Sequence, residues 1–170
     1  MTAMSDKPKA VAAAPRRAAE PLYTPDQRQR RDATVWTLVQ GVLAPLQFLV
    51  FLVSLTLVLR YMATGIGYEA ATWSIVIKTA ILMTIMVTGA IWEKVVFGQY
   101  LFAPSFFWED VFSFAVIALH LLYIIGLWLA LFSPDQLILI ALVAYAAYAV
   151  NAGQFLWKLR QARLQAEVPA

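Results

Sequence analysis

Cysteine is absent from the 170 residues, and histidine occurs once, at position 120. The lack of cysteine excludes disulfides, thiolate chemistry and iron–sulfur ligation. A single histidine excludes bis-histidine haem ligation and zinc sites built on several histidines of one chain. The sequence also has neither a glycine-rich phosphate loop nor a nucleophile elbow. What remains for chemistry is a small set of acidic and amide side chains.

Charged residues are missing from most of the chain as well. Residues 33–59, 111–134 and 136–157 contain no Lys, Arg, Asp or Glu, and residues 71–92 contain only Lys78. Each run is long enough to cross a bilayer, because about 20 apolar residues at ~1.5 Å rise span a hydrocarbon core of roughly 30 Å. A transmembrane β-barrel would require alternating polar and apolar residues, whereas these runs are apolar on every face. The sequence therefore predicts an all-α integral membrane protein, a four-transmembrane-helix bundle.

The expected organisation is one transmembrane domain over residues 23–163. Its spans are predicted at about 35–59, 71–96, 108–132 and 135–158, after a disordered cytoplasmic tail at 1–22 and before a flexible C-terminus at 164–170. A short amphipathic segment precedes the first span, with Thr24 as N-cap, Pro25 at the first helical position and Gln27 at the third. Gly41 and Pro45 fall inside the first span and predict a bend there.

The distribution of positive charge predicts the orientation. Ten of the thirteen basic residues lie in the two tails, and an even number of spans returns both tails to one side. The positive-inside bias then places both termini in the cytoplasm. Because flanking positive charge sets topology, no nucleic-acid partner is needed to explain it. The aromatic link at 97–108 is expected in the headgroup layer, with Ser105 as the N-cap of the third span.

Carboxyl groups near the cytoplasmic surface are the candidate catalytic residues: Glu93, Glu109 and Asp110. If the second and third spans are antiparallel neighbours, Glu93 shares a site with Glu109 or Asp110. Two adjacent carboxylates repel, so one keeps a proton near neutral pH and can act as a general acid. The alternative is a surface ion pair of Glu93 with Lys94 or with an arginine of the tail.

His120 lies deeper, on a stripe of the third span that faces the bundle interior. The stripe has helical spacing and comprises Glu109, Ser113, Val116, His120 and Tyr123. His120 either binds a ligand or is a structural histidine bonded to a neighbouring helix. Lys78, in contrast, is expected to extend outward to the membrane surface.

Amide and aromatic side chains complete the candidate substrate-binding set. Gln40, Asn151 and Gln154 are at the same depth as the carboxyl groups, although transmembrane amides commonly hold helices together. Trp92 and Trp108 belong to an interfacial aromatic belt, or they contact a flat apolar ligand that arrives from the lipid.

Three stretches carry a resemblance to a known family. They are LYTP at 22–25 leading to RRDATVWTLVQGVLAP at 30–45, IWEKVVFGQYLFAP at 91–104 with FWED at 107–110, and YAVNAGQF at 148–155. Over about residues 22–163 the chain resembles the vinyl bacteriochlorophyllide hydratase family. The resemblance implies hydration of the ring A 3-vinyl group of chlorophyllide a, or of the related bacteriochlorophyllide, to a 1-hydroxyethyl group in bacteriochlorophyll synthesis. It also implies a bacterial inner, photosynthetic membrane.

The chemistry of vinyl hydration assigns roles to the candidates. Glu93 or Glu109 would be the acid and Asp110 its electrostatic partner, while Asn151 and Gln40 would orient the water. His120 would contact the magnesium that the substrate itself carries, so no protein-bound cofactor is expected. Other expected partners are the lipid bilayer, further enzymes of bacteriochlorophyll synthesis and a second copy of the chain.

Two other classes of protein stay open at the level of sequence. A pigment-binding or photosynthetic-complex assembly protein would use the aromatic link and His120 to hold a chlorin without changing it. A purely structural subunit would neither bind nor convert pigment.

Overall fold

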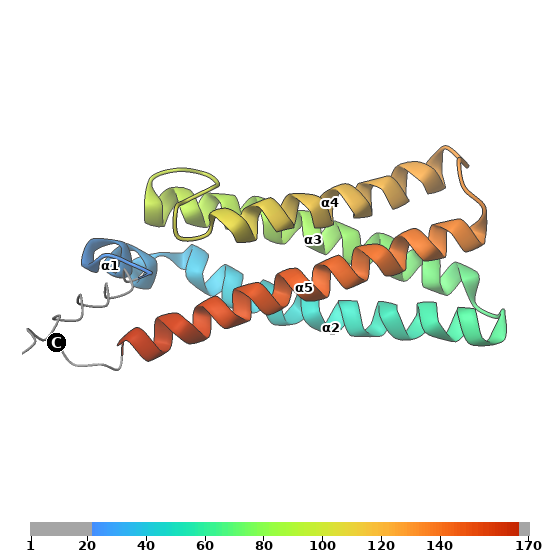
Figure 1. Ribbon diagram of the computed structural model, residues 1–170, viewed down its shortest axis with the longest axis horizontal. Coiled ribbons are helices and arrows are strands. Elements are labelled where there is room, and N and C mark those ends of the chain that lie inside the picture. Colours follow the sequence, from blue (N-terminus) through green and yellow to red (C-terminus); the bar gives the residue numbers. More distant parts are fainter. Residues whose placement is uncertain (1–21, 167–170) are drawn as a thin grey trace, which may run out of the picture.

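The computed structural model describes residues 22–166, and all regular structure in that range is helical. The helices are α1 (Pro25–Ala33), α2 (Val35–Thr64), α3 (Tyr68–Phe97), α4 (Phe107–Trp128) and α5 (Pro134–Ala166), as Figure 1 shows. Four of them, α2 to α5, are long and apolar enough to cross a membrane. The predicted all-α fold is confirmed, and the chain is a multi-pass membrane protein.

The helix ends differ from the predicted span boundaries. Helix α2 continues beyond residue 59 to Thr64, and α5 continues beyond 158 to Ala166. Hydropathy marks only the part of a helix within the hydrocarbon, whereas 30 residues at ~1.5 Å rise extend about 45 Å. The predicted tail at 1–21 and residues 167–170 lie outside the described residues.

Helix α4 is shorter than predicted, ending at Trp128 instead of residue 132. Ala130 adopts a left-handed conformation with φ of 51°. The N–H of Leu131 then donates to the carbonyl of Gly126 at 2.9 Å, and the N–H of Ala130 donates to that of Leu127 at 3.3 Å. This pair of bonds is a Schellman motif, which satisfies the last carbonyls and ends the helix before Pro134.

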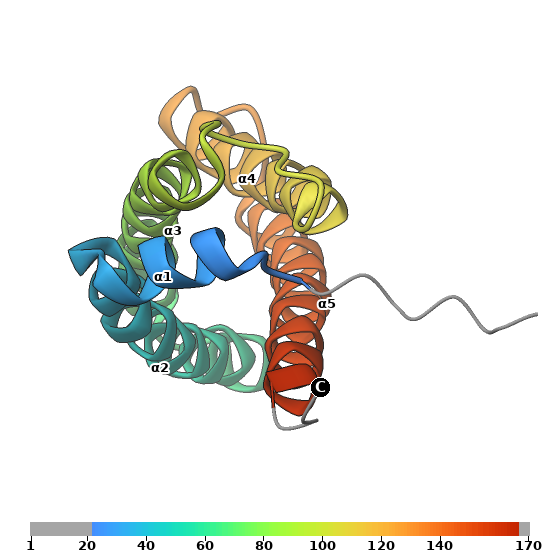
Figure 2. The same cartoon turned by 90° about the vertical axis from the view of Figure 1, so that its left-hand side faces the viewer.

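The start of the first helix agrees with the sequence prediction. Thr24 and Gln27 form a reciprocal capping box, and Pro25 is in the first turn of α1. Figure 2 shows α1 crossing the end of the bundle. In α2, Pro45 has no N–H to donate to the carbonyl of Gly41, and Figure 1 shows the first turns of α2 running at an angle to the rest. The predicted bend is therefore present.

The long helices form two hairpins, α2 with α3 and α4 with α5. Packing is close within each hairpin and sparse between them, and Figure 2 shows the four helices arranged as a ring around the bundle axis. An apolar core joins the hairpins through Phe51, Ile75, Val116, Tyr123 and Tyr145. Links α2–α3 and α4–α5 lie at one end, whereas α1, the α3–α4 link and the end of α5 lie together at the other (Figure 1).

Candidate active site

The end of α3 and the start of α4 bring two carboxyl groups together. Glu93 and Asp110 are only 5% and 3% exposed, and their carboxyl groups are in hydrogen-bonding contact. Two carboxyl groups can share a hydrogen bond only if one carries a proton. The structure therefore agrees with the predicted shared site and identifies Asp110, rather than Glu109, as the partner of Glu93.

Backbone amides of the α3–α4 link hold this pair in place. The N–H of Phe102 donates to Oδ2 of Asp110 at 2.6 Å, and the N–H of Ala103 donates to Oε2 of Glu93 at 3.3 Å. Phe102 reaches this position with φ of 59°, an uncommon conformation for a residue with a side chain. A short loop thus wraps back over the carboxyl groups and supplies donors from two consecutive residues.

Ser105 does not cap α4, so that prediction is wrong. Phe106 is the N-cap and makes no side-chain capping bond, whereas Oγ of Ser105 donates to the carbonyl of Leu22 at 2.9 Å. The hydroxyl connects the link to the segment before α1. The sequence could not distinguish a capping serine from one that bonds to Leu22, because Ser105 lies only one residue before the actual N-cap, Phe106.

Glu109 forms an ion pair instead of joining Glu93. Its Oε2 lies 2.6 Å from Nζ of Lys158 on α5, and both side chains are mostly buried. The expected alternative, a Glu93–Lys94 ion pair, does not form among the described residues, because Lys94 donates to the carbonyl of Gly98 at 2.7 Å. Lys158 neutralises Glu109 and leaves the Glu93–Asp110 pair as the acidic element of the site. The sequence signal for this contact is the helical spacing of Lys158 from Asn151 and Gln154, which places all three side chains on one face of α5.

The amides of α5 face the same part of α4. Asn151 Nδ2 donates to Oγ of Ser113 at 2.8 Å, and Ser113 donates to the carbonyl of Glu109. Oδ1 of Asn151 and Oε1 of Gln154 are buried and have no hydrogen-bond partner within the described range 22–164. Two buried amide oxygens of α5 are thus available as acceptors.

Gln40 and Trp92 fasten the α2–α3 hairpin rather than the α4 side of the site. Gln40 Nε2 donates to Oγ1 of Thr88 at 2.8 Å, and Trp92 Nε1 donates to Oγ1 of Thr37 at 2.9 Å. The indole of Trp92, the residue before Glu93, also packs edge-on against the ring of Phe106. Trp108 is 66% exposed and does not join this set.

An aromatic cluster closes the α1 end of the bundle. It comprises Tyr23, Trp92, Phe97, Phe106 and Phe155. The guanidinium of Arg31 lies 4.8 Å from the centre of the Tyr23 ring. Burial raises the pKa of the Tyr23 phenol, and the charge of Arg31 opposes that shift.

His120 is separate from the carboxyl pair and bonds to a lysine. Its predicted stripe is confirmed, since Glu109, Val116, His120 and Tyr123 are all buried. Ten residues of α4 separate His120 from Asp110, about 15 Å along the helix. Nε2 of His120 lies 2.6 Å from Nζ of Lys78, which is 0% exposed. The prediction that Lys78 extends outward is therefore wrong: the side chain turns into the bundle.

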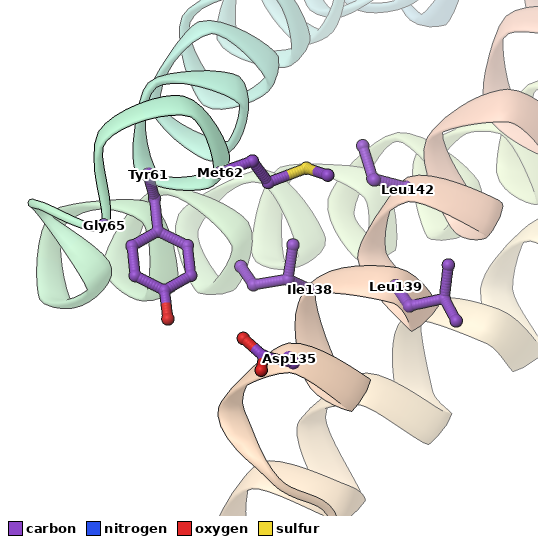
Figure 3. Close-up of a pocket in the computed structure, with 7 residues that line it drawn as sticks. All are labelled: Tyr61, Met62, Gly65, Asp135, Ile138, Leu139 and Leu142. Atoms are coloured by element: carbon purple, nitrogen blue, oxygen red, sulfur yellow. The ribbon is translucent and has the colours of Figure 1, made fainter.

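A cavity of about 400 Å³ opens at the opposite end, between the last turns of α2 and the first turns of α5. Figure 3 shows its lining, which includes Tyr61, Met62, Asp135 and Leu142 but none of the predicted site residues. Its single carboxylate has no second acid or amide beside it in that lining. Two neighbouring carboxyl groups occur instead at the α1 end of the bundle, at Glu93 and Asp110. Among the described residues, no three His, Cys, Asp or Glu side chains form a group that could hold a metal ion.

The fold and the site define a multi-pass membrane protein with a buried pair of carboxyl groups beside apolar and aromatic side chains. The profile of the family described as 2-vinyl bacteriochlorophyllide hydratase (BCHF) matches residues 23–161. The chain belongs to the 2-vinyl bacteriochlorophyllide hydratase family.

Two curated relatives are similar to nearly the whole chain. A 2-vinyl bacteriochlorophyllide hydratase of Rhodobacter capsulatus is 73% identical over 148 residues, covering 85% of this chain and 84% of the relative. One of Cereibacter sphaeroides is 73% identical over 149 residues, covering 86% and 91%. No solved structure matches the chain significantly.

Proposed function

We propose that this protein is a hydratase of bacteriochlorophyll biosynthesis. It adds water to the ring A vinyl group of chlorophyllide a or bacteriochlorophyllide, position 2 in the relatives' name and position 3 in the numbering used above, and forms a 1-hydroxyethyl group. The observation that carries the assignment of the site is the buried Glu93–Asp110 pair, whose carboxyl groups lie close enough to share a proton. This is the group that an acid-catalysed addition requires.

The reaction begins with proton transfer. Glu93 delivers its proton to the terminal vinyl carbon, whose π electrons form the new C–H bond. The adjacent carbon becomes cationic, and the macrocycle delocalises that charge. The ionised pair then lies beside a cation, so its negative charge stabilises the intermediate in surroundings of low dielectric constant.

Water completes the addition at the cationic carbon. Its oxygen forms the C–O bond, and a proton leaves the water for the carboxylate pair, which restores the starting state. The buried oxygens of Asn151 and Gln154 support this step, because they are acceptors that can hold and orient a water. Proton donor and acceptor are both supplied by the chain, so the proposed reaction uses no protein-bound cofactor.

The apolar helices and the basic tails support proposals for the location of the protein and for its partners. The substrate reaches the site in the bilayer, and its magnesium stays part of the substrate. We place the protein in the photosynthetic inner membrane with both termini in the cytoplasm, where the basic tails favour them. Association with a second copy and with other enzymes of the pathway would shorten the transfer of an insoluble pigment.

The test is hydration of chlorophyllide a by membranes that contain this protein alone. In oxygen-18 water and in heavy water, the product should gain one labelled hydroxyl oxygen and one deuterium in its new methyl group. Glu93→Gln should lower kcat by roughly 10²- to 10⁴-fold, as expected for loss of a general acid. Glu69→Gln is the matched control, because Glu69 is an exposed glutamate in the first turn of the same helix.

The label pattern separates the competing outcomes. Pigment that binds stoichiometrically and keeps its mass would contradict hydration and favour a carrier. Full activity in Glu93→Gln would remove Glu93 from the mechanism while leaving the reaction itself in place.

A further inference from the structure

Lys78 is a buried cation without an acidic partner. It lies within the apolar α3, is 0% exposed, and its Nζ sits 4.2 Å from the centre of the Tyr148 ring. Among the described side chains, the ion pairs are Arg31–Asp32 and Lys158–Glu109, and Lys78 is in neither. An ionisable group inside a membrane domain without a counter-ion marks a binding site more often than a structural contact.

His120 orients the lysine. Nδ1 of His120 lies 2.7 Å from the carbonyl of Val116. A carbonyl can only accept, so Nδ1 carries the proton and Nε2 of the neutral ring accepts from Lys78. One ammonium hydrogen is used in this bond, and the other two stay available for an anionic acceptor.

Further unpaired polar atoms lie between Lys78 and the carboxyl pair. Both amide atoms of Gln47 are buried and unpaired within residues 22–164. Gln47 is one helical turn from Phe51, whose ring lies 4.9 Å from that of Tyr148, the residue beneath Lys78. Asn151, with its unpaired Oδ1, is one turn further along α5 from Tyr148. Buried amide atoms without partners in residues 22–164 thus lie on α2 and α5, next to the aromatic rings that contact Lys78.

The separation between Lys78 and the carboxyl pair suits one flat pigment. About 15 Å of α4 separates His120 from Asp110, a span comparable to a substituted macrocycle. With the vinyl group at Glu93 and Asp110, the flexible propionate chain on the neighbouring ring extends from the macrocycle toward the depth of Lys78. A chlorophyllide, unlike a chlorophyll, carries a free propionate carboxylate that can pair with an ammonium group.

We propose that Lys78, oriented by His120, binds the free propionate carboxylate of the substrate and thereby selects the free acid over its esters. This inference rests on the proposed function, because it takes the substrate to be a chlorophyllide. It assigns Lys78 to substrate specificity and leaves the proton transfers at Glu93 and Asp110.

The test compares chlorophyllide a with its propionate methyl ester in membranes containing the full chain. The wild type should favour the acid in kcat/KM by roughly ten- to hundredfold, the worth of one charge-assisted hydrogen bond. Lys78→Met should lower kcat/KM for the acid to the value for the ester and leave the ester unchanged. Lys78→Gln, a polar neutral replacement, should do the same. Lys94→Met, at an exposed lysine of the same helix, should retain the preference.

Pigment binding is measured by absorption titration, in parallel with the hydration assay. The inference would be overturned if the wild type had equal kcat/KM for the acid and the ester, or if both Lys78 variants kept the wild-type preference for the acid. If the wild type hydrates neither pigment, the proposed function fails. A binding preference for the acid that disappears in Lys78→Met would even then support Lys78 as the carboxylate site.

Discussion

At the residue scale, the two members of the carboxyl pair are held unequally. Asp110 accepts its backbone N–H at 2.6 Å, whereas Glu93 accepts at 3.3 Å. A short bond from a backbone amide favours the ionised form of a carboxyl group. Asp110 is therefore the better carrier of the negative charge, and Glu93 is the better carrier of the proton. This inequality is why the mechanism uses Glu93 as the acid.

Because the pair acts as one unit, its two members should not contribute independently. Glu93→Gln and Asp110→Asn should each reduce kcat by roughly 10²-fold or more, and the double variant should be little slower than the slower single variant. Single-turnover hydration of chlorophyllide a measures all three. Strictly additive losses would show that the two carboxyl groups act in separate steps.

The Glu109–Lys158 ion pair is expected to serve stability rather than chemistry. Lys158→Met should destabilise the protein by about 1–3 kcal/mol, since it leaves a mostly buried carboxylate without its partner. Thermal unfolding in detergent measures the loss. Arg160→Met, two positions along the same helix and exposed, is the control.

A compensating change makes this prediction sharper. Adding Glu109→Gln to Lys158→Met should restore most of the lost stability, because the uncompensated charge is then removed. A double variant as unstable as Lys158→Met would mean that another contact of Lys158 carries the effect, such as that of its Nζ with the Phe106 ring, whose centre is 5.2 Å away.

At the scale of elements, α3 ends where the chain must turn toward the site. Gly98 is its C-cap with φ of 87°, and the α3–α4 link that follows supplies both amide donors to the carboxyl pair. Gly98→Ala should cost about 1 kcal/mol, because a Cβ is disfavoured in this conformation. It should also lower kcat, since the donors of Phe102 and Ala103 would shift.

Gly41→Ala is the matched control for that substitution. Gly41 lies inside helix α2, its φ is not positive, and a Cβ there would meet nothing within 4 Å. Alanine favours a helix over glycine by up to about 1 kcal/mol, so Gly41→Ala should keep or raise the melting temperature and leave kcat unchanged. Equal losses in both variants would count against a special role for the link.

Local sequence pattern was sufficient to predict the helices and part of the site. Absence of charge over more than twenty residues determines a span, and helical spacing determines which residues of α4 face inward. A site shared by Glu93 with Glu109 or Asp110 followed from antiparallel neighbours joined by a short link, and the structure selects Asp110. Helix ends in the headgroup layer were less predictable because hydropathy changes gradually there.

Two buried contacts between helices could not be predicted in this way. From the sequence alone, Lys78 is expected to extend to the membrane surface. Only the position of α4 shows that it bonds to His120 in the interior. Glu109 resembles half of a carboxyl pair until α5 is known to bring Lys158 within 2.6 Å. Each depends on how helices rotate and slide against partners far away in sequence, which single-helix periodicity does not specify.

For the whole molecule, the absence of cysteine makes topology directly measurable. Ile66→Cys lies in the α2–α3 link and Gln99→Cys in the α3–α4 link, and both positions are exposed. With both termini in the cytoplasm, a membrane-impermeant maleimide added to intact spheroplasts should label Ile66→Cys and spare Gln99→Cys. Permeabilised cells should label both, and the reverse pattern in spheroplasts would invert the proposed orientation.

The sparse packing between the two hairpins also has a thermodynamic consequence. Gln47, Asn151 and Gln154 bury polar atoms that have no partner within residues 22–164, and each such atom weakens the unliganded fold. A ligand that satisfies them should raise the melting temperature in proportion to the logarithm of its concentration above Kd. Substrate and hydrated product differ only by one added water, so both should restore the same bonds and bind with similar strength. Departure of product, which reopens the interior between the hairpins, should then be slowed by the same bonds that hold the substrate.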